Sequence, residues 1–577
     1  MASFVLVGGL LWWWLQPQPS PPDLARYSPR EALLFIEMTS LPAGLRRLET
    51  LAFWQAIHPA IGVPGQLTDI LTGARLVEWL DVGPAEARLL ARARWGLVVT
   101  GFAAEVVPPE SQPPLKPPDG DGATLDVTPR LVLCLTSGLP VEQTTAVARN
   151  CLPLVARKLF GGDVQFSEQT HHSALLLCFR HVERPTTALW AAVVGGALLL
   201  ANDEAALRAC LDAAAGRRAA LADLPAFRRA RQTVGGEQAL LFAFANPAGL
   251  DAALRLRSSR PSIGGKLLVN GQEQSLTASL LAGLLEGLGY GLDVQDGTTL
   301  ERYHLSLHPQ LVAELQPHLA QRLDASLAAG LIAYTNGVAV LGLSRPLTAL
   351  DRLQTAVAAR SNAAVAFVAR ELVAGLRERY GVRPHEPLDD ALGDQWLLLS
   401  PASAPDGGTV LGVRVRDKAR VLPTLDRYLR ADGAGLVNPS PTYLGVPLVV
   451  STHRDRRAAC FLDDWLFVGD QAALERFLNQ RRSGAPPPPL PPLPAEAFLH
   501  RCYRSQVDLN TATLALIALM RAGDPTPARL EEPAVRRAIE QQPPAMGYFR
   551  LQADGFYGEL RSPIGNLAYL ASFFTGR

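Results

Sequence analysis

The sequence lacks the short motifs that mark most catalytic and cofactor sites. It contains no G-x-S-x-G nucleophile elbow, no H-E-x-x-H zinc motif, no P-loop and no G-x-G-x-x-G after a predicted strand. Its closest approach to a phosphate loop is Gly264-Gly265-Lys266, but Leu267 follows where such a loop requires Ser or Thr. The sequence therefore indicates no catalytic, cofactor-binding or metal-ligating residue, and it favours a non-enzymatic protein without a cofactor.

An excess of charge of either sign is also absent. The 577 residues include 55 Lys and Arg against 54 Asp and Glu, which gives a net charge of +1. A nucleic-acid-binding protein needs a basic surface to neutralise phosphates, so we predict no nucleic-acid partner. Apolar residues, in contrast, make up 48% of the chain, which is enough for several hydrophobic cores.

One local pattern occurs twice in the chain. An apolar strand ends, an Asp follows, and a helix opens with Ala-Ala-Leu, first at Asp203 and again at Asp470, which lies 470 − 203 = 267 residues later. Four further pairs of segments recur in the same order: Ala32–Phe35 with Ala364–Phe367, Leu152-Pro153 with Leu422-Pro423, Ala239–Leu241 with Ala497–Leu499, and Gly289-Tyr290, Asp296-Gly297 and Glu301 with Gly547-Tyr548, Asp554-Gly555 and Glu559. So long a period indicates duplicated domains rather than a solenoid, and we predict two pseudo-repeats, roughly Tyr27–Pro346 and Ser361–Arg577.

The hydrophobic pattern predicts an α+β fold with antiparallel sheets and helices packed on one face. Gly195-Gly196 and its counterpart Asp463-Asp464 suit hairpin turns, and Asp203 and Asp470 suit helix N-caps. The predicted strands are Glu31–Glu37, Arg94–Phe102, Leu131–Leu135, Ala174–His181, Leu189–Ala201, Gln238–Asn246, Gly289–Leu307 with a turn at Asp296-Gly297, and Leu331–Leu343. The predicted helices are Leu45–Ile57, Leu276–Leu288, Pro309–Leu327, and one from the cap Ser137 to Leu159 with a kink or break at Pro153, while Val107–Pro129 is predicted as a surface loop.

These patterns divide the chain into segments. They are an apolar N-terminal anchor with a Pro-rich spacer (1–26), the two parts of the first repeat (27–235 and 236–346), the first part of the second repeat (361–484), a Pro-rich linker (485–494) and the second part of that repeat (495–577). The proline tract Pro486–Pro494 favours an extended spacer.

The N-terminal segment Ala2–Leu15 is uncharged and ends in Trp12-Trp13-Trp14, a composition typical of a membrane interface. It is shorter than the ~20 apolar residues that span a bilayer, and no Lys or Arg precedes it. Arg26 and Arg30 follow it, which by the charge rule favours an internal C-terminal side. We predict an anchor or uncleaved signal, and the alternative is a buried apolar segment or a start codon placed too late.

The six cysteines form no C-x-x-C pair: Cys134, Cys151, Cys178, Cys210, Cys460 and Cys502. Four of them align with apolar residues of the other repeat (Cys151 with Val421), which favours buried thiols over disulfides, although an oxidising compartment would allow disulfides. The one metal-like cluster is His171, His172, Cys178 and His181. On a strand His172 and Cys178 would share a face and His181 would point away, so we predict no metal. Trp190, Trp396 and Trp465 are predicted to cover the core or turns.

These features resemble a bacterial family catalogued as domain of unknown function 3352. The resemblance rests on the Ala-x-x-Phe opening, the Leu-x-x-x-Asp-x-x-Ala-Leu step at Asp203 and Asp470, and the apolar N-terminus, and it covers roughly Tyr27 to the C-terminus. It implies a membrane-anchored, extracytoplasmic protein with no assigned chemistry, and it supplies no functional residues. The short N-terminus without a basic flank departs from the family.

We therefore predict a membrane-anchored binding or scaffolding protein on the periplasmic or extracellular face, tethered by its N-terminal segment and with an unknown protein partner. One alternative is a carrier that holds a lipid or pigment in an apolar groove between the two halves. Such a groove would have a volume of ~300–1,000 Å³. The other alternative is a hydrolase whose nucleophile and base come from distant parts of the chain and meet in a cleft.

Overall fold

The computed structural model describes residues 23–68, 83, 91–107, 124–136, 141–172, 174–184, 187–247, 284–319, 323–324, 330–332, 335–360, 363–383, 386–401, 408–430, 436–437, 442–452, 456–482, 494, 496–520 and 526–568. The chain divides into two compact units. Unit 1 contains Met1–Pro42, Ile70–Gly101 and Pro129–Leu224, and unit 2 contains Ala43–Asp69, Phe102–Thr128 and Pro225–Arg577. Both units combine helices with antiparallel sheet, so the predicted α+β class is confirmed.

The sheet of unit 1 is antiparallel, with neighbouring strands in the order β4-β5-β6-β7-β3-β2-β1. Its strands alternate buried and partly exposed residues, as in β1, because only one face of a pleated strand points to the core. The bounds are β1 Leu34–Met38, β2 Arg94–Val107, β3 Thr124–Thr136, β4 Val164–His171, β5 Ala174–His181, β6 Ala188–Val194 and β7 Ala197–Ala201.

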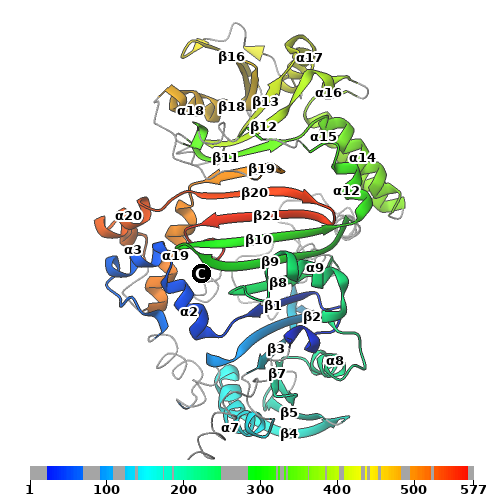
Figure 1. Ribbon diagram of the computed structural model, residues 1–577, viewed down its shortest axis with the longest axis vertical. Helices are drawn as coiled ribbons and strands as arrows, with labels where there is room; N and C mark the ends of the chain where they lie inside the picture. Colours follow the sequence, from blue (N-terminus) through cyan, green and yellow to red (C-terminus); the bar gives the residue numbers. More distant parts are fainter. Residues whose placement is uncertain are drawn as a thin grey trace, which may run out of the picture. The chain divides into compact units, whose positions relative to one another are not determined.

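Two helices of unit 1, α7 (Val141–Phe160) and α8 (Glu204–Ala214), pack against strands of this sheet (Figure 1). Helix α8 begins where the side chain of Asp203 accepts a hydrogen bond from the amide of Ala206 at 2.8 Å, which is the predicted N-cap. Helix α7 continues through Pro153, so the break predicted there is absent, and the predicted cap Ser137 lies outside the described residues. Two short 3₁₀ helices, η1 (Leu24–Tyr27) and η3 (Leu221–Asp223), contact each other.

Unit 2 contains a longer antiparallel sheet in the order β14-β16-β17-β18-β13-β12-β11-β19-β20-β21-β10-β9-β8, and β15 also pairs with β16. Figure 1 shows its middle strands β19, β20, β21, β10 and β9 stacked in this order. The bounds are β8 Leu241–Ala245, β9 Leu285–Gln295, β10 Thr298–Leu307, β11 Thr335–Gly342, β12 Leu392–Pro401, β13 Val410–Val415, β14 Leu436–Val437, β15 Thr442–Tyr443, β16 Val446–Ser451, β17 Arg457–Leu462, β18 Trp465–Asp470, β19 Ala497–Tyr503, β20 Ala545–Gln552 and β21 Gly555–Ser562.

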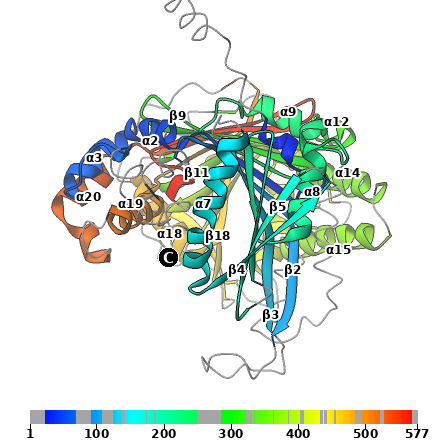
Figure 2. The same cartoon turned by 90° about the horizontal axis from the view of Figure 1, so that it is seen from below.

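The helices of unit 2 form several groups. Helices α3, α19 and α20 lie together, α9 contacts β9, and α14 packs along α15 (Figures 1 and 2). The bounds are α3 Ala52–Ala60, α9 Pro225–Thr233, α12 Pro309–Leu315, α14 Pro346–Ala358, α15 Ala363–Arg379, α16 Leu388–Ala391, α17 Lys418–Leu429, α18 Gln471–Arg482, α19 Gln506–Met520, η5 Pro527–Glu531 and α20 Pro533–Glu540.

The strand order of unit 1 has a counterpart inside unit 2. The series β4-β5-β6-β7-β3-β2-β1 matches β14-β16-β17-β18-β13-β12-β11, with the same antiparallel pairs and the same sequence of connections. In both series the last hairpin is followed by a helix that begins with an Asp cap. The side chain of Asp470 accepts a hydrogen bond from the amide of Ala473 at 2.7 Å, and the side chain of Asp203 accepts one from the amide of Ala206. The hairpin turns lie at Gly195-Gly196 and Asp463-Asp464, as predicted.

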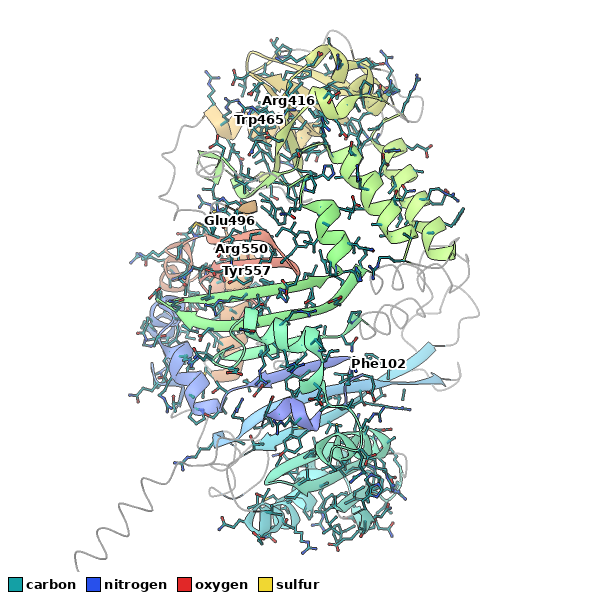
Figure 3. All side chains as sticks on the ribbon, turned by 45° about the vertical axis from the view of Figure 1, so that its right-hand side comes forward. Phe102, Arg416, Trp465, Glu496, Arg550 and Tyr557 are labelled. Atoms are coloured by element: carbon teal, nitrogen blue, oxygen red, sulfur yellow. The ribbon has the colours of Figure 1, made fainter. Side chains whose placement is uncertain are left out.

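A second correspondence lies at the centre of the unit 2 sheet, where β10 pairs with β21. Glu301 lies opposite Leu560, and Arg302 lies opposite Glu559. Glu301 and Glu559 hold the same position in the two Gly-Tyr…Asp-Gly…Glu motifs, so each of these glutamates faces the residue that follows the other one in the sequence. Tyr290 and Tyr303 donate to the carboxylate of Glu301, and Tyr548 and Tyr557 donate to Glu559. In Figure 3 Arg550 and Tyr557 of this hairpin lie side by side, and the Arg550 guanidinium lies 4.9 Å from the centre of the Tyr557 ring.

The structure corrects two of the aligned segments. Ala364–Phe367 belongs to helix α15 whereas Phe35 lies in strand β1, so this match is wrong, and the strand order makes β11 the counterpart of β1. The match of Leu152-Pro153 with Leu422-Pro423 is three residues out of register. The buried residues Ala148, Leu152 and Ala156 of α7 have the spacing of Val421, Leu425 and Leu429 in α17, an offset of 421 − 148 = 273, so Cys151 corresponds to Thr424 rather than Val421.

Several predicted elements also differ from the structure. Leu45–Ile57 forms two helices, α2 (Leu41–Glu49) and α3, because the chain is extended at Leu51. Leu285–Leu288 begins strand β9 instead of ending a helix, and α12 ends at Leu315. Part of the predicted loop Val107–Pro129 is strand, because Val107 is the last residue of β2 and residues 124–129 belong to β3. Strand β4 was missed because its residues are mostly polar and exposed, as expected for an edge strand.

All six cysteines are buried free thiols, which confirms the prediction for them. Burial raises the pKa of the Cys134, Cys460 and Cys502 thiols to about 12, which makes their reactive thiolate forms scarce. Trp190 is buried, whereas Trp396 and Trp465 are partly buried against hydrophobic clusters, as expected for core or turn cover. No helix in the described part of the chain is both long and apolar enough to span a membrane. Ala2–Leu15, Gly264-Gly265-Lys266 and nearly all of 485–494 lie outside the described residues.

Candidate functional site

A ligand-sized cavity with hydrophobic walls lies wholly within unit 2. It has a volume of about 430 Å³, inside the range of ~300–1,000 Å³ that is typical of small-molecule sites. Its walls come from helices α14 to α17 and strands β12, β13 and β18. The lining residues are Pro346, Leu347, Leu350, Leu376, Arg377, Tyr380, Val382, Leu388, Leu392, Trp396, Leu411, Val413, Val421, Thr424, Leu425, Tyr428, Leu466 and Val468.

The floor of this pocket is a patch of sheet. Leu411 pairs with Val468 and Val413 with Leu466, so these four side chains come from two neighbouring strands at matched positions. Helix α17 closes one side with Val421 and Leu425. The alternating pattern of β13 and β18 thus places apolar residues on the face that borders the pocket.

The roof of the pocket is the α14–α15 hairpin, which is fastened at both ends. Asp389 accepts hydrogen bonds from the amides of Leu347 and Thr348 at 2.9 and 2.8 Å and so caps the first turn of α14. After α15, the Nε of Arg427 donates to the carbonyl of Gly381 at 2.8 Å, and the same guanidinium is ion-paired with Glu386. The Tyr380 ring stacks on that of Tyr428, with ring centres 6.1 Å apart.

Arg377 is the one charged residue in the pocket wall. One terminal nitrogen of its guanidinium donates to both carboxylate oxygens of Asp351 at 2.6 and 2.7 Å. Its Nε is buried and has no hydrogen-bond partner among the described residues. Two other polar groups of the wall are already engaged, because Trp396 Nε1 donates to the Leu343 carbonyl at 3.0 Å and the Thr424 hydroxyl accepts from Arg427 at 3.0 Å.

Sequence reasoning did not identify this site. It anticipated an apolar groove between the two halves, whereas most of this pocket is built by residues of the second predicted repeat, and only Pro346, Leu347 and Leu350 precede that repeat. One signal was available: Leu376 and Tyr380, which both line the pocket, lie one helical turn apart.

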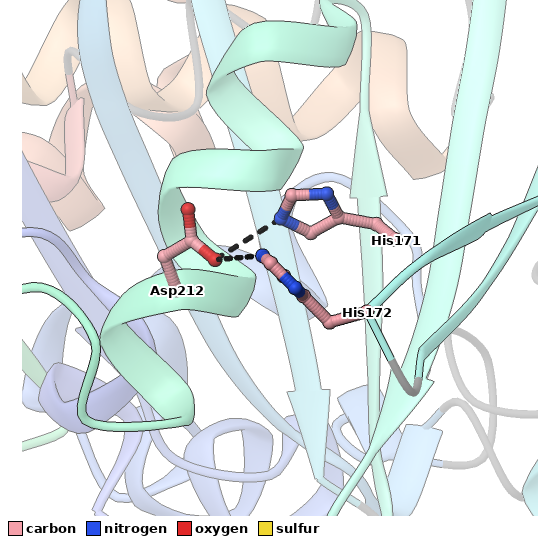
Figure 4. A group of neighbouring side chains, drawn as sticks. All are labelled: His171, His172 and Asp212. Carbon is pink, nitrogen blue, oxygen red and sulfur yellow. Dashed lines mark hydrogen bonds and ion pairs between the residues drawn. The ribbon is translucent and has the colours of Figure 1, made fainter.

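The predicted metal-like cluster is only partly assembled. His171 ends β4, His172 sits in the following turn with a left-handed backbone (φ 52°), and both face Asp212 of α8 (Figure 4). The Nε2 atoms of His171 and His172 lie 3.0 and 3.8 Å from one carboxylate oxygen of Asp212. Cys178 is not part of this cluster, and His181 accepts hydrogen bonds from the amides of Glu183 and Arg184 elsewhere.

The surroundings of this cluster disfavour a cation. Arg208 lies 3.3 Å from Nδ1 of His171, and a guanidinium can only donate, so Nδ1 accepts and the proton stays on Nε2. A metal would need that Nε2 to be free of its proton. Arg217 also donates to the same Asp212 oxygen at 2.8 Å, and the pKa of Asp212 is lowered by Arg217 and His171 in spite of its partial burial. The geometry therefore supports a tie between the β4–β5 turn and α8.

One arrangement in unit 2 resembles a nucleophile with its base. The Ser306 hydroxyl lies 3.2 Å from Nδ1 of His304, and Nε2 of His304 lies 3.3 Å from a carboxylate oxygen of Asp554. Ser306 and His304 have no exposed surface, and the register opposes Ser306 to Gly555 across the sheet. A substrate carbonyl cannot reach a hydroxyl packed in this way, so the arrangement does not favour a hydrolase.

No protein-family model, no curated protein and no solved structure matches this chain. The resemblance to domain of unknown function 3352 therefore stays a prediction.

Proposed function

We propose that this chain is a non-enzymatic binding protein that holds a small apolar ligand in the pocket beneath the α14–α15 hairpin. The observation that carries the proposal is the pocket itself, a cavity of about 430 Å³ whose walls are almost entirely hydrophobic side chains. Protein interiors are packed with few voids larger than a water molecule. A cavity of this size with a few placed polar groups is what a ligand site has, and burial of the ligand's apolar surface would supply the affinity at ~25 cal/mol per Å².

We propose further that the chain arose by duplication of one folding unit. The packing of helices on one face does not extend to unit 2, because α17 packs with Ala459 and Leu466 and α18 packs with Cys460 and Phe467, which lie on the other face. Three correspondences support the duplication: the shared strand order of the two series, the Asp203 and Asp470 caps, and the Tyr–Glu contacts of the hairpins that meet at β10 and β21. The pocket then belongs to the second copy, and binding is a property of one copy rather than of the scaffold.

Membrane attachment through Ala2–Leu15, with the body on the periplasmic or extracellular face, completes the proposal. Its support is the uncharged, Trp-ended sequence of that segment. Cell fractionation with protease accessibility on intact cells tests it. The protein is expected in the membrane fraction and open to external protease, and its release by a salt wash alone would contradict the tether.

A tryptophan placed at the pocket wall tests the ligand site. Leu376 lines the pocket and is 45% exposed on α15, so Leu376→Trp fills the cavity without disturbing the buried core. We expect it to weaken binding of the fluorescent apolar probe N-phenyl-1-naphthylamine at least ~10-fold, or ~1.4 kcal/mol. Leu372→Trp is the matched control, because Leu372 lies one turn earlier, is 50% exposed and does not line the pocket. Equal binding by both variants, or no binding by the parent protein, would overturn the ligand site.

A further inference from the structure

We infer that the pocket takes the tail of a long-chain anion such as a fatty acid, whose carboxylate lies outside the pocket against the exposed side chain of Arg501. This inference rests on the proposed function, since it specifies the ligand class of the same pocket. It follows from the register of the unit 2 sheet, which joins the pocket floor to an exposed cation.

The first step is the path that leads out of the pocket. The register places one residue from each of the strands β18, β13, β12, β11 and β19 in a single row: Val468, Leu411, Leu398, Ala339 and Arg501. Residues that pair directly opposite each other project from the same face of a sheet. Val468 and Leu411 line the pocket, and the next residue of the row, Leu398, is 51% exposed. The pocket floor therefore continues as an apolar row that ends at Arg501.

The second step is the charge at the end of this row. Arg501 is exposed and forms no ion pair within the described part of the chain, and its guanidinium lies 4.4 Å from the centre of the Tyr503 ring. The other nearest positions on this face of β11, β19 and β20 are uncharged as well: Gly337, Leu341, Leu499, Ala545, Gly547 and Phe549. A carboxylate placed here gains a charge-assisted contact with the guanidinium and meets no acidic side chain at these positions.

The third step is length. Neighbouring strands lie ~4.8 Å apart, so along the row Arg501 is about 14 Å from Leu411 and about 19 Å from Val468. An extended hexadecanoate spans this distance, with its carboxylate at Arg501 and its last carbons in the pocket, whereas octanoate cannot reach both ends. A long chain also covers the exposed Leu398, and this burial of apolar surface adds to its affinity.

The polar groups of the pocket wall provide a different kind of anchor. The Trp396 Nε1 and the Thr424 hydroxyl are already hydrogen-bonded within the protein, and Arg377 is already ion-paired. The Tyr380 and Tyr428 rings also line the pocket, and their hydroxyls can hydrogen-bond a ligand. A headgroup held by either hydroxyl would lie inside the pocket, and its binding would not depend on Arg501.

Displacement of bound N-phenyl-1-naphthylamine from the full-length protein at pH 7 by hexadecanoate, octanoate and hexadecyltrimethylammonium tests this inference. Hexadecanoate is expected to bind at least ~10-fold more tightly than the ammonium compound, which has the same chain length and the opposite charge. Arg501→Gln should weaken hexadecanoate binding ~5-fold, and Arg501→Glu should weaken it at least ~10-fold, because repulsion then replaces attraction. Octanoate and the probe should bind all variants equally, since neither reaches Arg501 from the pocket.

Arg504→Gln is the matched control, because Arg504 is also exposed but follows the end of β19 and is not part of the row. Unchanged probe binding shows that each variant is folded. Hexadecanoate binding that Arg501→Glu does not weaken, or that Tyr380→Phe or Tyr428→Phe weakens more than Arg501→Glu does, would overturn the inference and leave the apolar pocket intact. Failure of the fluorescent probe to bind at all would instead overturn the proposed function.

Discussion

Helix α7 in unit 1 and helix α17 in unit 2 cover sheets with the same strand order, yet their surroundings differ. The residues beneath α7 form a hydrophobic cluster that includes Phe179 and Leu198. The equivalent surface beneath α17 borders a pocket of about 430 Å³. Topology alone therefore does not decide whether a sheet face carries a filled core or a ligand-sized space.

The two surfaces also differ in side chains at matched positions. Leu177 pairs with Ala191 in unit 1, and Val449 pairs with Ala459 at the matching position of unit 2. Two residues further along these strands, Phe179 therefore corresponds to Ser451. Both are almost fully buried, but one contributes a ring and the other a hydroxymethyl group. Helix α7 is also longer, with 20 residues against 12 in α17. In unit 2 the α14–α15 hairpin forms a roof beside the shorter helix α17 and leaves space beneath it.

The largest expected effect comes from truncating one matched pair of leucines. Leu198 and Leu466 occupy the same register position, are 6% and 5% exposed, and differ in that Leu466 borders the pocket. Leu198→Ala should cost ~2–5 kcal/mol, whereas Leu466→Ala should cost roughly half as much, because the space that it leaves joins an existing pocket instead of forming a new enclosed cavity. Hydrogen exchange of the β7 and β18 amides measures each region separately. Equal losses would mean that the space beneath α17 is filled in solution.

The next effect concerns how the roof is fastened. Partial burial alone would raise the pKa of Glu386, but hydrogen bonds from Arg427 and the Arg383 amide lower it below the usual range. A lowered folded-state pKa means that this contact stabilises at pH values above the ordinary glutamate range and is lost as pH falls through the folded pKa. In acid we therefore expect the opening free energy of the α15 amides, measured by hydrogen exchange, to fall by ~1–3 kcal/mol.

Glu386→Gln should remove most of this acid dependence. Arg427→Leu should loosen α15 already at pH 7, because it removes the contacts of Arg427 with Gly381 and Glu386. Leucine is also the residue at the corresponding position of α7, Leu154, which is partly exposed. Exchange of α8 amides in unit 1 is the internal control. Acid-sensitive exchange that persists in Glu386→Gln would show that another group controls the roof.

Much of the local structure could be predicted from the sequence. Apolar alternation and paired turn residues located the hairpins at Gly195-Gly196 and Asp296-Gly297, and the spacing from Asp203 to the following apolar residues located a capped helix. These features are set by residues close together in the chain. Alignment errors arose where a repeated dipeptide, such as Leu-Pro in α7 and α17, outweighed the burial spacing.

The pocket could not be predicted, because it depends on distances between segments rather than on motifs. Its roof uses helix α15, whose opening residues Ala364–Phe367 were aligned with the segment that forms β1, and its charged wall residue Arg377 is an ordinary helix-surface residue in the sequence. A void has no sequence signature, since it arises from side chains that are absent. The same reasoning explains why the Asp212 partner of His171 was missed, because 212 − 171 = 41 residues separate them.

The smallest expected effect comes from enlarging one side chain in each floor. Val468 corresponds to Leu200 of unit 1, so Val468→Leu gives the pocket floor the residue that the unit 1 sheet has at the matching position. With free space above it, the added group should stabilise β18 by ~0.8 kcal/mol and weaken probe binding. Ala191→Val, which enlarges a fully buried alanine in the hydrophobic cluster of unit 1, should instead destabilise β6 by ~1–3 kcal/mol, because the added methyl groups must displace packed neighbours. Hydrogen exchange of the β18 and β6 amides measures both changes in stability. A gain at β18 with a loss at β6 would sharpen the distinction between a filled and an unfilled floor, whereas a loss of stability at both strands would remove it.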